Sequence, residues 1–300
     1  MLGTKSVNLL VTSHKGERWP RVVRRLFAAV MGMLMLTACQ QVASAAPSQA
    51  SPPSTHAAAP HQFTVYDTTF YAHLDPARYG AVKADIIYEG RVAALSGQPT
   101  RHHHPDGRPT SELVLPPKDA YQKLVRQHLA NPGPLVLDYE TLYLTGTPQV
   151  AQRRFRKLST LLKWTREVAP HKQIGFWDLL GNTQRRYYPL GRAISAREDV
   201  LFPSLYTNST DSKARWQHRL DHALAEAKQL APGKPVYPYL WPQFQGLHSG
   251  QHYMSRELWS YELQACRKAT KAVVLWGGGP HGTNNTAWLD VLKRFLAHRS

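Results

Sequence analysis

Cysteine is scarce in this sequence, since its 300 residues include two, Cys39 and Cys266. A disulfide framework is therefore excluded, and the fold has to be held together by packing. Cys266 lies in a helical pattern with Leu258 and Leu263. This position predicts a small buried side chain rather than a nucleophile.

Acidic residues are also few: 20 Asp and Glu stand against 37 Lys and Arg, and the formal net charge is +17. A charge of this size attracts polyanions such as nucleic acids, anionic lipid surfaces and acidic polysaccharides. The secretory leader described next argues against nucleic acid. Solubility combined with attraction to an acidic cell envelope is the less specific interpretation of the same excess.

The N-terminal region lacks an apolar run long enough to span a membrane convincingly. Its uncharged stretch, residues 26–38, follows several basic residues, which is the layout of a secretory signal, so residues 1–38 are predicted to be a signal peptide. The stretch ends in Leu36-Thr37-Ala38-Cys39, which resembles a bacterial lipoprotein box. Lipidation of Cys39 would anchor the protein in the bacterial cell envelope, at the outer membrane or on the periplasmic side.

A competing cleavage site lies at Ala43-Ser44-Ala45 and would release a soluble, secreted protein. We favour lipidation, because Cys39 directly follows the apolar run. Residues 39–61 are rich in Ala, Ser, Pro and Gln and show no periodicity, which predicts a disordered tether.

The remaining residues, 62–300, alternate short apolar runs with helical patterns, separated by Gly and Pro. The expected strands are residues 64–70, 85–88, 135–139, 173–177, 200–206, 235–240 and 272–276. The expected helices are residues 117–130, 148–168, 211–230, 255–270 and 284–298. This alternation predicts an α/β fold with a parallel sheet inside and helices outside, in the form of a TIM-like (β/α) barrel of seven strands.

Two acids separated by one residue, Asp138 and Glu140, follow the continuous apolar run of residues 135–137. Such a run is typical of a buried parallel strand, in which Asp138 and Glu140 would share one face and Tyr139 the other. The C-terminal ends of parallel strands carry the chemistry of α/β enzymes. Two carboxylates held close together raise the pKa of one of them, which suits an acid–base pair. The alternative interpretation is a solvated strand end with two ordinary acids.

Aromatic residues mark the ends of several other predicted strands. They are Trp177 (followed by Asp178), Tyr206, Tyr239 with Trp241, and Trp276. Because sugars present apolar C–H faces, aromatic rings around a carboxylate pair indicate a glycan site. Packing within the barrel is the alternative explanation for any one of these rings.

Several segments occur in the order typical of one known enzyme family. They are Phe63-Thr64-Val65-Tyr66, Glu112-Leu113-Val114-Leu115, Val136-Leu137-Asp138-Tyr139-Glu140, Gly175-Phe176-Trp177, Glu198 to Tyr206, Pro235-Val236-Tyr237-Pro238-Tyr239 and Val273-Val274-Leu275-Trp276-Gly277. Together they resemble the animal-type hyaluronidases, of the sperm and venom kind, over nearly the whole of residues 62–300. The chain departs from that family in lacking its disulfides, in its shorter loops, and in Trp177, where a tyrosine is expected.

This resemblance implies a retaining glycoside hydrolase in which the substrate's own N-acetyl group, rather than an enzyme residue, attacks the anomeric carbon. Glu140 would be the general acid and then the base, and Asp138 would hold the acetamido N–H of the charged intermediate. Tyr206 would position the acetamide oxygen, while Trp276 and Trp177 would line the sugar subsite. The further expected substrate contacts are Tyr139, Tyr239 and Asp178. We expect a monomer that binds a polymer of β-linked N-acetylhexosamine, hyaluronan-like or from a cell wall, and needs no cofactor.

Two other functions remain open at this point. A peptidoglycan muramidase can also carry D-x-E at a barrel strand end. A non-catalytic glycan-binding envelope lipoprotein would explain the short loops, the basic surface and Trp177. No metal is predicted: His102-His103-His104 lies in a loop without an element to fix its geometry. Gly277-Gly278-Gly279 lacks the lysine of a phosphate loop and is interpreted as a close approach of backbone to ligand.

Overall fold

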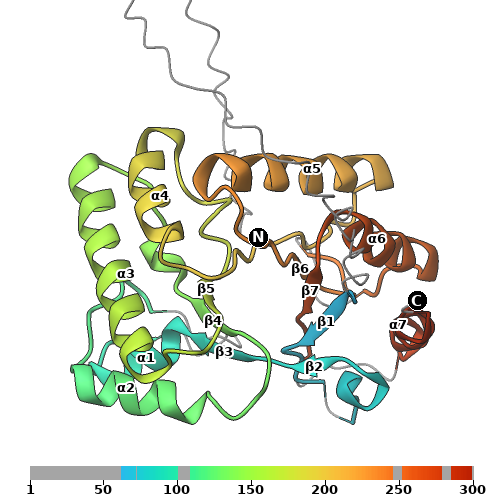
Figure 1. Cartoon of the computed structure of the whole chain (residues 1–300), viewed down its shortest axis with the longest axis horizontal. Coiled ribbons are helices and arrows are strands. Elements are labelled where there is room, and N and C mark those ends of the chain that lie inside the picture. Colours follow the sequence, from blue (N-terminus) through green and yellow to red (C-terminus); the bar gives the residue numbers. More distant parts are fainter. Residues whose placement is uncertain (1–61, 72, 101–108, 246–251, 279–284, 299–300) are drawn as a thin grey trace, which may run out of the picture. The chain divides into compact units, whose positions relative to one another are not determined.

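The computed structural model describes residues 62–71, 73–100, 109–245, 252–278 and 285–298, all within one compact unit, residues 57–300. The predicted signal peptide, the lipidation site Cys39, the tether of residues 39–61 and the cluster His102-His103-His104 lie outside the described residues. Two strand groups and their flanking helices make up the described part (Figure 1).

The strands are parallel, as the alternation of strand and helix predicts, but they form two sheets instead of the single sheet expected. The first has the order β2 (Val82–Lys83), β1 (Thr64–Asp67), β7 (Ala272–Leu275), β6 (Tyr239–Leu240). The second has the order β3 (Asp85–Tyr88), β4 (Leu135–Asp138), β5 (Ile174–Phe176). Every strand pair in both sheets is parallel, so the carboxyl ends of neighbouring strands meet at one edge.

The two sheets share one extended segment. Only Ala84 separates β2 from β3; its N–H donates to the Asp67 carbonyl in β1 at 3.0 Å. The next N–H, that of Asp85, donates to the carbonyl of Pro134, just before β4, at 3.1 Å. Residues 82–88 therefore leave the edge of β1 and join the edge of β4.

On the other side, residues 200–206 run between β5 and β6 as isolated parallel bridges rather than as the continuous strand that the sequence predicts. The bridges are Trp177↔Phe202, Leu201↔Val236 and Ser204↔Tyr239. Pro203 and Pro238 have no N–H to donate, so the ladder is interrupted at both. Pro238 also shortens the strand expected at residues 235–240, which in the structure is Tyr239–Leu240.

The helices lie to the outside of the strands within this unit (Figure 1). They are α1 (Glu89–Leu95), α2 (Lys118–Gln127), α3 (Pro148–Val168), α4 (Tyr188–Ser195), α5 (Lys213–Leu230), α6 (Arg256–Ala269) and α7 (Ala287–Ala297). The side chains of Thr147, Ser212 and Ser255 cap α3, α5 and α6 by accepting a backbone N–H of the first turn. The short α1 and α4 are absent from the sequence prediction, because so few turns carry little periodicity. None of the helices described is long and apolar enough to cross a membrane.

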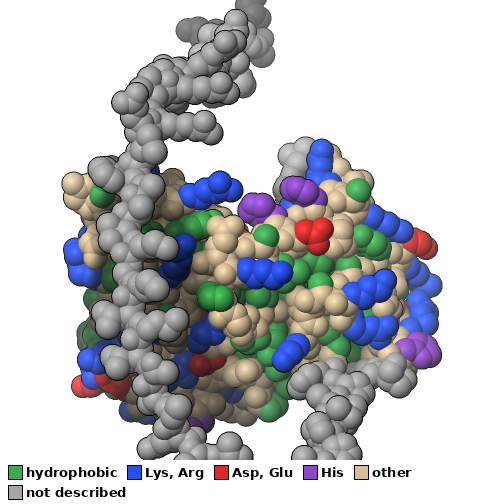
Figure 2. Space-filling view, turned by 45° about the horizontal axis from the view of Figure 1, so that its top comes forward, with side chains coloured by type: hydrophobic (Ala, Val, Ile, Leu, Met, Phe, Trp, Pro, Cys, Tyr) green, Lys and Arg blue, Asp and Glu red, His purple; other side chains and the backbone are tan. Residues whose placement is uncertain are grey.

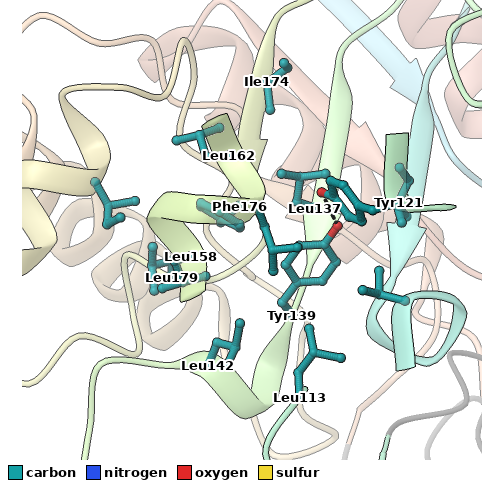
Figure 3. Close-up of a cluster of buried hydrophobic side chains, with 14 of the residues drawn as sticks. Leu113, Tyr121, Leu137, Tyr139, Leu142, Leu158, Leu162, Ile174, Phe176 and Leu179 are labelled. Carbon is teal, nitrogen blue, oxygen red and sulfur yellow. Dashed lines mark hydrogen bonds between the residues drawn. The ribbon is translucent and has the colours of Figure 1, made fainter. Parts of the chain in front are cut away.

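The two faces of β4 contribute to different cores. Leu135, Leu137 and Tyr139 pack on the side of α2 and α3 (Figure 3), whereas Val136 packs with Phe202, Tyr239 and other residues of the opposite side. Side chains of a strand alternate between faces, so Asp138 shares the face of Val136. The acid at the end of β4 therefore points away from the helices. Cys266 is fully buried in α6, as predicted.

The stability of the fold should depend on pH through Glu262, which is fully buried in α6. Burial raises its pKa from an ordinary 4.5 to about 8. The folded protein therefore keeps a proton that the unfolded chain loses, and the stabilising contribution, complete below about pH 4.5, is lost as the pH rises towards 8. Glu262→Gln cannot ionise. We expect its free energy of unfolding, measured with urea, to gain on that of the wild type over this range, by at most about 1.4 kcal/mol per pH unit.

The matched control is Glu257→Gln on the same helix. The pKa of the exposed Glu257 is lowered, chiefly by hydrogen bonds, so its effect lies at more acidic pH and should stay level between pH 5 and pH 8. A constant difference between Glu262→Gln and wild type over that range would show that Glu262 titrates normally.

Candidate active site

Asp138 closes β4 and is 7% exposed, and Glu140 follows as the first residue of a 3₁₀ helix, η2 (Glu140–Leu142). The predicted strand thus ends one residue early. Strand alternation does not set the direction of the partly exposed Glu140, which depends on η2. Both acids lie at the carboxyl end of a fully buried parallel strand, where the sequence predicts them.

Two phenols, Tyr206 and Tyr239, pack in one buried cluster with Val136, on the face of β4 that Asp138 shares. Burial raises the pKa of both phenols well above the usual 10, and negative charge on Tyr88 and Asp138 would raise it further. Both side chains therefore stay neutral and can donate a hydrogen bond at any physiological pH. The end of β4 thus combines a carboxyl group with neutral phenols from residues 200–206 and β6.

The ring of Tyr206 forms a contiguous aromatic wall with those of Trp241 and Trp276. The ring of Tyr206 stacks on that of Trp276 with centroids 5.5 Å apart and planes 26° apart. Trp241 meets Trp276 edge to face at 4.9 Å. The indole N–H of Trp276 donates to the hydroxyl of Tyr88 at 2.8 Å, which fixes the orientation of the ring. The wall is therefore preorganised from four separate strand ends.

The rings differ in how much of them solvent can reach. Tyr239 is fully buried and Tyr206 and Trp241 nearly so, whereas Trp177 and Trp276 are partly exposed. Phe70, after β1, is 40% exposed and contacts Trp276 edge to face. The accessible apolar faces therefore come from the ends of β1, β5 and β7, and such faces are what a sugar ring can stack on.

Gly277 allows the aromatic wall to pack closely. The sequence is interpreted differently, as a place where the backbone approaches a ligand. A Cβ at this residue, whose φ is +135°, would lie 2.4 Å from the Tyr71 hydroxyl and 2.6 Å from the ring of Trp241. The Trp241 N–H and the Tyr71 hydroxyl both donate to the side-chain oxygen of Gln243, at 3.0 and 2.6 Å. Gly277 thus makes room for protein side chains behind Trp276 rather than for a ligand.

Two predicted substrate contacts lie elsewhere. Tyr139 is 2% exposed in the core beside α2 and α3, and its hydroxyl lies 2.9 Å from that of Tyr121 (Figure 3). It faces away from Asp138 because it is the next residue along the chain at the end of β4. The prediction that Tyr139 contacts a glycan directly is therefore wrong.

Asp178 forms hydrogen bonds within the protein and does not face the aromatic wall. Its carboxylate accepts the N–H of Ser204 at 2.9 Å and the side-chain N–H of Asn182 at 2.7 Å. It lines a cavity of about 340 Å³ with α5 residues that include Glu226. Burial, assisted by the charge of Glu226, raises its pKa from 3.8 to about 7. Its φ of +49° turns the side chain out of the direction expected at the end of β5.

Tyr88 and Phe70 also contact the aromatic wall, although they are not among the predicted site residues. Tyr88 ends a predicted strand as the other aromatic residues do, and this signal was sufficient to find it. Phe70 ends the expected strand of residues 64–70 in the same way.

Two cavities of the described residues lie away from this site. One is the 340 Å³ cavity with Asp178, and the other, about 260 Å³, is lined by Leu162, Arg166 and neighbouring residues of α3 with Arg197. Neither includes Asp138 or Glu140. Within the described ranges, no group of three or more His, Cys, Asp or Glu side chains is arranged to hold a metal ion.

No family model and no curated protein matches the chain. Solved structures do. In fold, the chain is similar to bee venom hyaluronidase. The structure of that protein in complex with a hyaluronic acid tetramer shares 17% identity at a TM-score of 0.51, over 79% of this chain and 97% of that chain. A monoclinic crystal structure of the same protein gives 18% identity and a TM-score of 0.48 over the same shares.

A β-D-glucuronidase from Dictyoglomus thermophilum shares 13% identity at a TM-score of 0.45, over 77% of this chain and 44% of that chain. At such identities a likeness concerns the fold alone. The likeness to the structure with the hyaluronic acid tetramer agrees with the α/β fold, and it leaves the activity to be argued from the site.

Proposed function

We propose that this chain is a glycoside hydrolase acting on a polymer of β-linked N-acetylhexosamine, with its active site at the carboxyl ends of β4, β6 and β7. The observation that carries the proposal is the arrangement around Asp138: a buried carboxyl group beside neutral phenols and a fixed aromatic wall. A carboxyl group and phenol donors can hold the polar edge of a sugar, and the accessible rings can stack on its apolar face.

The proposed scaffold is a seven-stranded (β/α) barrel. The pairing path supports it: residues 82–88 connect β1 to β4, and residues 200–206 connect β5 to β6, which pairs with β7 and so returns to β1. In such a barrel all carboxyl ends lie on one face, which brings Asp138 and Trp276 together.

The proposed mechanism needs no enzyme nucleophile. Glu140 protonates the leaving oxygen and then takes a proton from the attacking water. The substrate's acetamide oxygen attacks the anomeric carbon, and Asp138 accepts a hydrogen bond from the acetamido N–H as positive charge develops on the new ring. Tyr206 positions the acetamide oxygen by donating a hydrogen bond to it, and Trp276 with Trp177 stacks on the sugar. The neutral state of Tyr206 suits this donation.

An acidic polysaccharide is the substrate class that the charge favours. The formal net charge is +17, and Lys and Arg side chains outnumber Asp and Glu on the face shown in Figure 2. Hyaluronan and chondroitin carry both uronate charge and N-acetylhexosamine, so long-range attraction and the site chemistry agree.

A non-catalytic glycan-binding protein is the second candidate, and one observation favours it. Three of the aromatic rings at the strand ends, those of Tyr206, Tyr239 and Trp241, are nearly or fully buried. Such burial suits a protein that binds a glycan only on the rings that remain exposed.

Product analysis of the full chain on hyaluronan, chondroitin and purified peptidoglycan tests the proposal. We expect new N-acetylhexosamine reducing ends from an acidic polymer with the wild type and far slower release with Glu140→Gln. Cleavage of peptidoglycan alone would indicate a muramidase. Binding to an immobilised polymer that is unchanged in Glu140→Gln, with no new reducing ends from either protein, would support the non-catalytic candidate.

A further inference from the structure

Glu89 is a buried acid that the proposed mechanism does not use. It is the first residue of α1, directly after β3, and is 2% exposed. Its carboxylate accepts the backbone N–H of Thr141 at 3.0 Å and, through its other oxygen, the hydroxyl proton of Thr141. One carboxylate thus takes both donors of a residue 52 positions further along the chain.

Thr141 is the residue after Glu140 and the second residue of η2. Its hydroxyl also accepts the N–H of Leu113 at 2.9 Å, so the side chain is held from two sides. The bond between Glu89 and the Thr141 N–H fixes the peptide that joins Glu140 to Thr141. The direction in which Glu140 leaves the backbone depends on that peptide.

Tyr88, the residue before Glu89, contacts the chain on the N-terminal side of Glu140. Tyr88 pairs in register with Asp138 in the ladder between β3 and β4, and its hydroxyl accepts the N–H of Trp276. The dipeptide Tyr88-Glu89 therefore contacts the chain on both sides of Glu140 and also orients the aromatic wall.

From this geometry we propose that Glu89 is a positioning residue for Glu140: it holds the η2 turn so that the acid reaches the leaving oxygen. The inference rests on the proposed function. A carboxylate suits this role because it only accepts and offers two oxygens, one for the N–H and one for the hydroxyl. A glutamine in the same position would keep one accepting oxygen and would turn its NH₂ group, itself a donor, towards the other of the two donors.

Glu89→Gln should therefore lower kcat by about 10- to 100-fold, since a small misplacement of a reacting group has effects of this order, while KM changes less than about threefold. Thr141→Val should act in the same way, and Thr141→Ser should retain most of the activity. The Glu89→Gln/Thr141→Val double variant should lose no more than the worse single variant, because both break the same contact.

Glu198→Gln is the matched control, since Glu198 is equally buried and accepts one backbone N–H, that of Phe176, at 2.6 Å. It should leave kcat unchanged. Amide hydrogen exchange across Glu140–Leu142 supplies a readout that needs no activity: Glu89→Gln should speed it at least about tenfold, and Glu198→Gln should not.

Unchanged exchange in Glu89→Gln, or faster exchange with an unchanged kcat, overturns the inference. A wild type that cleaves no polymer overturns the proposed function instead, and the exchange rates still decide whether Glu89 holds the turn. Equal losses of kcat in Glu89→Gln and Glu198→Gln would show a general effect of removing a buried acid.

Discussion

Glu140→Gln should lower the turnover of an N-acetylhexosamine polymer by about 10²- to 10⁴-fold, the range that general acid catalysis contributes. The amide has nearly the size of the carboxyl group and can still form hydrogen bonds, but it cannot deliver a proton to the leaving oxygen. Because Glu140 begins η2 and is partly exposed, the substitution leaves no buried cavity. The measurement is kcat from new reducing ends, with the thermal midpoint as the check on folding.

The loss should be smaller for a substrate whose leaving group needs little protonation, since the acid then matters less in the first step. Glu167→Gln on the exposed face of α3 is the control for loss of a glutamate, and it should retain full turnover. Wild-type turnover in Glu140→Gln would remove this residue from the mechanism and would leave the aromatic wall as a binding surface.

The part of the site on β4 is predictable from sequence because its signals are local. An apolar run between Gly133-Pro134 and two acids defines a short buried strand, and alternation of side chains separates Asp138 from Tyr139. The structure agrees with that separation. The predicted contact of Tyr139 with substrate conflicts with this alternation, and the burial of Tyr139 against Tyr121 agrees with the alternation.

The parts that could not be predicted depend on contacts between distant residues or on backbone angles. The register between residues 200–206 and β6 is set by which N–H groups remain beside Pro203 and Pro238. The direction of Asp178 follows from its positive φ, and an aspartate at a strand end gives no sign of that angle. The anchoring of Thr141 by Glu89 joins residues whose separation no periodic pattern records.

The assignment of Asp138 predicts an effect on turnover that is separate from binding. In the proposed mechanism its partner is the acetamido N–H of a ring that carries charge only during the reaction. Asp138→Asn should therefore lower kcat by about 10²- to 10³-fold, as loss of one stabilising contact to developing charge does, and change KM little. A thiazoline mimic of the charged intermediate should inhibit the wild type strongly and Asp138→Asn weakly.

Asp85→Asn provides the matched control, because Asp85 begins β3 and pairs with Leu135 at the opposite end of the ladder that pairs Tyr88 with Asp138. It should leave kcat and thiazoline inhibition as in the wild type. A retaining hydrolase with an enzyme nucleophile would instead form a covalent glycosyl intermediate, which a fluoro-sugar traps. Such an adduct on Asp138 would contradict the substrate-assisted mechanism and keep the glycosidase proposal, because a carboxylate at the end of β4 would then attack the anomeric carbon itself.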